Sequence, residues 1–175
     1  MRYVALLRGI NVGGNTMIKM AELKNSFESL GLENVVTYVN SGNIAFDSKK
    51  SAEKTLVKKL EDVIEKDFGK QVPVMVREQN EIPKIIAANP FEGEFESHKE
   101  MHVMFLREEM PNDKMQQLLD AAPKNERYAA IGRELYCHLP MGVIDSLLGK
   151  SFLEKKLKLA VTGRNWRTTE KLAEL

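Results

Sequence analysis

Hydrophobic residues along the first 78 positions alternate between continuous apolar runs and helix-like spacing. Residues 3–7 (Tyr-Val-Ala-Leu-Leu) form an unbroken apolar run, which predicts a strand that is buried on both faces. Two segments with helical spacing and three further strand-like runs follow, at residues 20–30 and 56–68 for the helices and 35–39, 43–46 and 72–76 for the strands. The resulting order is β-α-β-β-α-β, the split βαβ unit.

The same order of elements recurs in the second half of the chain. The predicted elements are a strand at 101–106, a helix near 111–122, a hairpin over 128–139, a largely helical stretch at 143–157, a strand at 159–162 and a terminal helix at 167–175. We therefore predict an α+β protein of two tandem ferredoxin-like (βαββαβ) subdomains, with antiparallel sheets and a C-terminal helix. The repeated order indicates an internal duplication.

The boundary between the two predicted subdomains lies in residues 79–99. This segment carries a short predicted helix, which ends at Asn89-Pro90 because a proline disfavours helical backbone in the residue before it. An acidic, turn-rich run then follows, as expected for an exposed connection. The predicted organisation is a first subdomain at 1–78, a connecting segment, and a second subdomain at 100–175.

Composition and charge restrict the functional classes. The hydrophobic fraction of 43% and charged fraction of 29% are ordinary for a folded protein, and a net charge of +1 argues against a dedicated nucleic-acid binder. No stretch approaches the roughly 20 apolar residues that a membrane span requires. The single cysteine, Cys137, cannot form an internal disulfide, which fits a reducing compartment. We expect a cytoplasmic protein without a membrane partner.

The loop after the first strand is the main candidate site. In a split βαβ unit the end of the first strand lies beside the turn that joins the second and third strands. This topology gathers a guanidinium, amide groups, a hydroxyl and glycine N–H groups, from Arg8, Gly9, Asn11, Gly13, Gly14, Ser41, Gly42 and Asn43. Such donors suit a phosphate or a carboxylate.

The same loop also allows two other interpretations. Residues 9–16 match the P-loop pattern except that Asn15 replaces its lysine, and the apolar period of the next helix starts only near Met20, so nucleotide hydrolysis is disfavoured. Alternatively, the glycines serve only tight backbone turns, while Arg8 and Asn11 tie the loop to the hairpin.

A second candidate segment is Arg164-Asn165-Trp166 in a lysine-rich region near the C-terminus. A cationic face with an exposed indole could bind phosphate and stack on a ring. The structural alternative, which we favour, is that Trp166 anchors the last helix while Thr168 or Asn165 caps it.

Other side-chain combinations do not form a recognisable site. His98 and His102 have helical spacing but straddle a loop and a strand, so we expect no metal, and nothing in the sequence calls for a cofactor. Cys137 and His138 are adjacent on a strand and point to opposite faces, so they cannot form a catalytic dyad. RNA-recognition domains share the element order, but here the central strands offer only Tyr3 and Phe46 for stacking.

Three separated motifs resemble a bacterial family known as domain-of-unknown-function family 1697. The motifs are the opening Leu6-Leu-Arg-Gly-Ile-Asn-Val-Gly-Gly14, then Thr37-Tyr38 with Ser41-Gly42-Asn43 and Phe46, and finally Thr162, Arg164-Asn165-Trp166, Thr168 and Leu172. The resemblance implies paired ferredoxin-like subdomains in a cytoplasmic protein and implies no activity. Gly163 departs from the pattern, because a threonine or another polar residue is expected before Arg164.

The sequence therefore favours a binding module for a small anionic ligand at the loop after the first strand. One alternative is an enzyme that acts on a phosphorylated or nucleotide-like substrate, although no base or nucleophile is evident in the sequence. Another alternative is a protein-interaction or assembly module, since open sheet edges can pair between chains, or an RNA-binding protein.

Overall fold

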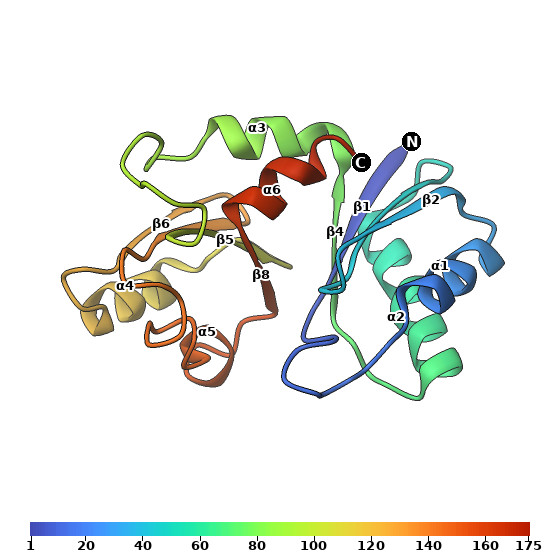
Figure 1. Ribbon diagram of the computed structural model, residues 1–175, viewed down its shortest axis with the longest axis horizontal. Coiled ribbons are helices and arrows are strands. Elements are labelled where there is room, and N and C mark those ends of the chain that lie inside the picture. Colours follow the sequence, from blue (N-terminus) through green and yellow to red (C-terminus); the bar gives the residue numbers. More distant parts are fainter. The chain divides into compact units, whose positions relative to one another are not determined.

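Each half of the chain forms a four-stranded antiparallel sheet, and helices pack against each sheet (Figure 1). The computed structural model describes residues 1–175. Unit 1 consists of Met1–Ile82 and Leu172–Leu175, and unit 2 consists of Pro83–Lys171. None of the helices is long and apolar enough to cross a bilayer. The predicted α+β class with paired sheets is confirmed.

Unit 1 has the strand order β2-β3-β1-β4, as the split βαβ unit requires. Its elements are β1 (Arg2–Leu7), α1 (Met20–Ser29), β2 (Glu33–Tyr38), β3 (Asn43–Asp47), α2 (Glu53–Phe68), β4 (Val74–Glu78) and the 3-10 helix η1 (Gln79–Glu81). All neighbouring strand pairs in this sheet are antiparallel. The predicted and observed elements agree in order and type.

Alternating strand residues build the core of unit 1 against α1 and α2. Tyr3, Ala5 and Leu7 of β1 share one face and pack with apolar residues of both helices. The Tyr3 and Phe46 rings stack with their centroids 5.8 Å apart, and both are almost fully buried. These two aromatic residues therefore belong to the core and are not displayed for stacking on RNA bases.

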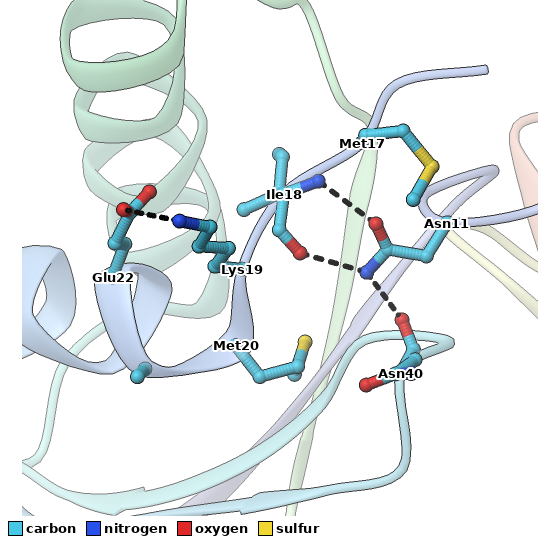
Figure 2. Close-up of a pocket in the computed structure, with 8 residues that line it drawn as sticks. Asn11, Met17, Ile18, Lys19, Met20, Glu22 and Asn40 are labelled. Atoms are coloured by element: carbon cyan, nitrogen blue, oxygen red, sulfur yellow. Dashed lines mark hydrogen bonds and ion pairs between the residues drawn. The ribbon is translucent and has the colours of Figure 1, made fainter. Parts of the chain in front are cut away.

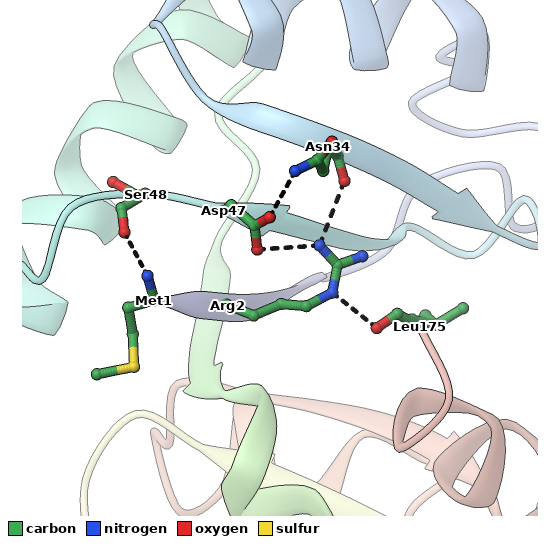
Figure 3. A network of polar contacts seen from close by, with 6 residues as sticks. All are labelled: Met1, Arg2, Asn34, Asp47, Ser48 and Leu175. Carbon is green, nitrogen blue, oxygen red and sulfur yellow. Dashed lines mark hydrogen bonds and ion pairs between the residues drawn. The ribbon is translucent and has the colours of Figure 1, made fainter.

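A polar network in unit 1 fixes its last residues against β1 (Figure 3). The Arg2 side chain donates from Nε to the Leu175 carbonyl at 2.8 Å and from Nη1 to Asp47 Oδ1 at 3.1 Å. Asn34 Nδ2 donates to the other Asp47 oxygen at 2.7 Å. The hydrogen bonds from Asn34 and Arg2 favour the carboxylate form and lower the pKa of Asp47.

Unit 2 repeats the topology with the strand order β6-β7-β5-β8. Its elements are α3 (Ile82–Ala87, which begins at the unit boundary), β5 (Met101–Leu106), α4 (Asn112–Ala121), β6 (Arg127–Ile131), β7 (Glu134–His138), α5 (Phe152–Lys155), β8 (Val161–Asn165) and α6 (Trp166–Leu172). The core of unit 2 joins β5, β7 and β8 to α4 and α5.

The segment expected to connect the two subdomains contributes to unit 2. Tyr136 of β7 donates its hydroxyl to the Ile85 carbonyl of α3 at 2.6 Å. Arg127 of β6 pairs with Glu94 at 3.2 Å, and its guanidinium lies 4.6 Å from the centre of the Phe91 ring. These contacts fasten residues 83–94 to the second sheet.

The prediction of a largely helical stretch at 143–157 is mostly wrong, because the only α-helix there is α5 (Phe152–Lys155). Ser146 Oγ donates to the Val143 carbonyl at 2.6 Å and accepts from the Gly149 N–H at 3.3 Å. A serine that bonds nearby main chain in this way competes with helix formation. Ser151 also has a φ of 58°, which no right-handed helix accommodates.

The last strand also begins and ends later than predicted, so that Arg164 and Asn165 lie in β8. The neighbouring Gly163 is explained by packing against β5. A Cβ at Gly163 would lie 2.5 Å from the Met104 sulfur, and the two residues are directly paired across the strands. Glycine at this position therefore leaves room for the Met104 side chain.

Candidate functional site

The end of β1 lies beside the turn between β2 and β3, as the predicted strand order requires. The Leu7 N–H donates to the Gly42 carbonyl at 2.8 Å, and Leu6 pairs with Asn43 across the strands. The Asn11 Nδ2 donates to the Asn40 carbonyl at 2.8 Å. The residues after β1 and the β2–β3 turn thus form one continuous rim of the first sheet.

The paired glycines of the loop form a miniature hairpin. Gly13 and Gly14 have φ angles of 59° and 75°, and the Asn15 N–H donates to the Val12 carbonyl at 3.1 Å. Two consecutive residues with positive φ are typical of a type I′ turn, which favours glycine. Residues 15–19 lie between these glycines and α1, so the loop does not lead directly into a helix as a P-loop does.

Asn11 holds the hairpin in place through three main-chain contacts (Figure 2). Besides its bond to Asn40, the Nδ2 donates to the Ile18 carbonyl at 2.8 Å, and the Oδ1 accepts from the Ile18 N–H at 2.8 Å. Asn11 has a φ of 54°, a conformation that asparagine tolerates better than most residues. Because these contacts use both amide hydrogens and the oxygen, the side chain acts mainly as a structural fastener.

The β2–β3 turn is equally constrained by Gly42 and Asn43. A Cβ at Gly42 would lie 2.8 Å from both Leu7 Cβ and Ile10 Cδ1. Asn43 is fully buried, and its Nδ2 donates to the Tyr38 carbonyl at 2.9 Å and to Ser41 Oγ at 3.2 Å. These residues define the shape of the rim.

Arg8 and Gly9 directly follow β1, and Arg8 contacts the residue that precedes β4. The Arg8 N–H donates to the Pro73 carbonyl at 3.0 Å, and the half-buried Arg8 already takes part in further contacts. Gly9 is exposed, with a φ of 66°. Arg8 is therefore part of the local structure and not an unengaged cation.

A cavity of about 740 Å³, here called the α1 cavity, opens at this rim (Figure 2). Its lining consists of Asn11, residues 17–22 and Asn40. Of the residues predicted from the sequence, only Asn11 lines it. The cavity faces the start of α1, where Lys19 precedes the helix in extended conformation and no side chain caps the first turn.

The first turn of α1 supplies part of the lining of the α1 cavity. The N–H groups of Met20, Ala21 and Glu22 have no partner within the helix, because a helix bonds each N–H to the carbonyl four residues earlier. The aligned peptide dipoles add a partial positive charge at this end. Lys19 also lines the cavity, and its ammonium lies 3.9 Å from Glu22 Oε1.

The segment Arg164-Asn165-Trp166 has structural roles within unit 2. Arg164 is buried and donates from Nη1 to Thr162 Oγ1 at 2.8 Å and to the Gly163 carbonyl at 2.7 Å; burial lowers its pKa to about 10. Asn165 Oδ1 accepts from the Thr168 N–H at 2.9 Å and so caps α6. Trp166 is buried, and its ring meets Phe95 edge-on at 5.9 Å.

The remaining candidate groups are separated within unit 2. Cys137 is buried in the core, and burial raises the pKa of its thiol. His102 points to the same core face, where burial first and the nearby His98 second lower its pKa to about 4. His138 lies on the opposite face, with Nε2 3.7 Å from Glu100 Oε2. No cluster of three His, Cys, Asp or Glu side chains could hold a metal ion.

Sequence reasoning missed residues 17–22 and Asn40 as lining residues of the α1 cavity. The available signal was the start of the apolar period at Met20, which marks a helix N-terminus a few residues after the glycine loop. The fold of the intervening hairpin, which turns that N-terminus towards Asn40, could not be deduced from spacing.

The fold and the sequence are similar to those of known proteins. The structure of the conserved bacterial protein SP0830 from Streptococcus pneumoniae superposes with a TM-score of 0.78 at 26% identity, over 99% of this chain and 97% of that chain. No curated protein matches the sequence. Residues 1–136 match the family described as "protein of unknown function (DUF1697)". With most of its length matched, the chain belongs to the DUF1697 family.

Proposed function

We propose that this protein is a binding module for a small anionic ligand, held in the α1 cavity. The observation that carries the proposal is that one cavity is lined by both the uncapped first turn of α1 and Lys19. Phosphate and carboxylate oxygens accept hydrogen bonds from such groups, and a helix N-terminus favours their negative charge. The hairpin after β1 and the β2–β3 turn form the frame of the site.

The charge balance at the cavity supports a ligand with one compact anionic group. Lys19 and Glu22 are the only charged lining residues, and their side chains are 83% and 57% exposed. A pair this exposed is worth little and is readily exchanged, so an anion can take the place of Glu22 beside the ammonium. The Glu22 carboxylate would then turn to solvent.

The lining residues favour binding over catalysis. They include no histidine, cysteine, serine or threonine, and the single carboxylate is exposed. General acid–base or nucleophilic chemistry needs a group with a matched pKa close to the reacting atom. The α1 cavity has positioning groups without such a catalyst, so a binding role agrees better with its chemistry than an enzymatic role.

A thermal-shift and calorimetric titration with inorganic phosphate, a nucleoside monophosphate and a dicarboxylate tests the proposal. At least one probe should raise the melting temperature of the wild type. Lys19→Gln should weaken that binding about two- to tenfold, whereas the matched change Lys66→Gln, in the last turn of α2, should leave it unaltered. An absent shift with every probe, or equal responses of the two variants, would reject the proposal.

A further inference from the structure

A second, smaller cavity in unit 1 lies at the other end of α1. It has a volume of about 250 Å³ and is bounded by the residues after α1, the loop after β3 and the first turns of α2. Its apolar wall consists of Leu30, Leu32, Leu56 and Leu60. We call it the leucine cavity. We propose that the leucine cavity binds a small amphipathic anion, meaning a short apolar body that carries one phosphate or carboxylate group.

The apolar body is indicated by the leucine wall. Leu56 and Leu60 are at most 2% exposed and form part of the core, while Leu30 remains 37% exposed at the cavity mouth. A ligand that covers Leu30 removes apolar surface from water, which stabilises the complex. Typical sites for drug-sized ligands begin at roughly 300 Å³, so a cavity of this volume suits a body no larger than a single ring or a short chain.

The anionic group is indicated by two lysines in the lining. Lys49 follows β3 and Lys59 lies on α2, and both are exposed at the edge of the cavity. No carboxylate lines this cavity. Two acidic residues follow Lys59 on α2: Glu61 accepts from the Val74 N–H at 3.0 Å, and Asp62 is bonded to Lys58 at 2.7 Å. Two ammonium groups beside an apolar wall match a ligand with an apolar body and an anionic head.

The cavity wall is held in position without a ligand. The Ser51 N–H donates to the Tyr3 hydroxyl at 3.2 Å, and the Ser48 N–H donates to the Met1 carbonyl at 2.9 Å. Figure 3 shows the reciprocal contact, in which the Met1 amino group donates to the Ser48 carbonyl at 2.9 Å. Because the loop that carries Lys49 is anchored at one end to Met1 and at the other to Tyr3, a ligand would find a preformed site, and little entropy would be lost in ordering it.

Nuclear magnetic resonance titration with phenyl phosphate, inorganic phosphate and phenol tests this assignment on the full chain. Phenyl phosphate combines both features, and each of the other probes carries one. Phenyl phosphate should shift the amide signals of residues 30–32 and 48–51, with a Kd on the order of 1 mM and about tenfold tighter than either half-probe. Inorganic phosphate shifts confined to residues 19–22 would report on the α1 cavity instead, so the two proposals fail independently.

Two variants separate the head group from the apolar wall. The double variant Lys49→Gln/Lys59→Gln should weaken phenyl phosphate binding about tenfold, and Leu30→Gln should weaken it without altering the preference for the anion. The matched control Lys66→Gln should bind normally. The proposal is overturned if residues 30–32 and 48–51 do not respond to phenyl phosphate. It is also overturned if the double variant binds as the wild type does and loses only stability, since the lysines would then serve only the carbonyl end of α1.

Discussion

The Asn11 side chain donates to the Asn40 carbonyl at 2.8 Å and so joins the hairpin after β1 to the β2–β3 turn. This single contact crosses 29 residues of sequence and forms one edge of the α1 cavity. The two hydrogen bonds between the Asn11 side chain and the Ile18 main chain place the start of α1 against the same rim. The position of the proposed anion site therefore depends on a residue that itself has no free donor for the ligand.

Replacing Asn11 should destabilise unit 1 and loosen the hairpin. Asn11→Ala leaves the Ile18 N–H and two carbonyls without their side-chain partner, and it places alanine at a positive φ, so we expect a loss of about 1–3 kcal/mol. Urea denaturation measures the loss, and hydrogen exchange of the Ile18 amide should accelerate. Asn25→Ala, at an exposed position of α1, is the control. Equal stability of both variants would show that the Asn11 side chain does not stabilise the hairpin.

Two glycines at the rim should respond very differently to the same substitution. Gly42→Ala introduces a Cβ 2.8 Å from Leu7 Cβ as well as a strained φ, and should cost about 2–5 kcal/mol. Gly13→Ala meets no atom within 4 Å and should cost only the backbone strain, about 1–2 kcal/mol. Thermal denaturation of the two variants compares them directly. A Gly13 variant as unstable as the Gly42 variant would refute this account of the turn.

The contact between Gly163 and Met104 should appear as a coupling in a double-mutant cycle. Gly163→Ala alone forces the Met104 sulfur to move and should destabilise unit 2 by about 1–3 kcal/mol. Met104→Ala removes the obstructing atoms and leaves space for the new methyl group. The double variant should therefore lose about 0.5–3 kcal/mol less than the sum of the two single losses. Strict additivity would mean that Gly163 does not make room for Met104.

His102 should make stability depend on pH in the mildly acidic range. Its pKa is lowered from 6.5 to about 4 by burial, with His98 adding to the effect, so the unfolded chain binds the proton more readily than the folded chain. The stability it contributes is thus present above pH 6.5 and declines as pH falls towards 4, by at most about 1.4 kcal/mol per pH unit. Urea denaturation of wild type and His102→Gln across this range should give a shallower slope for the variant. Parallel slopes would contradict the assignment.

The fold could be predicted because its signals are local. The unbroken apolar run of β1 and the helical spacing of apolar residues in α2 each indicate which residues are buried. The order of elements then selects the split βαβ topology. The stretch before α5 was mispredicted because its apolar residues suggested a helix, while the Ser146 side chain bonds to Val143 and Gly149 instead. Side-chain bonds of this kind leave no periodic signal in the sequence.

The sequence could predict that the loop after β1 lies beside the β2–β3 turn. Strand order was sufficient to bring the residues after Leu7 beside Gly42, since it follows from topology alone. The sequence could not decide between two functions for Asn11, because they depend on which hydrogen bonds the fold makes. One alternative placed its amide at an anion site, and the other had it tie the loop to the hairpin. The bonds to Ile18 and Asn40 agree with the second alternative.

The most direct test of the anion-binding proposal is a titration of the isotopically labelled protein with inorganic phosphate, followed through its backbone amide signals. The proposal predicts saturable shifts centred on the amides of residues 19–22, which form the uncapped first turn of α1. It also predicts that Lys19→Gln weakens the response while Lys66→Gln does not. Amides of residues 19–22 that stay unchanged while the rest of the spectrum responds to ionic strength alone would contradict it.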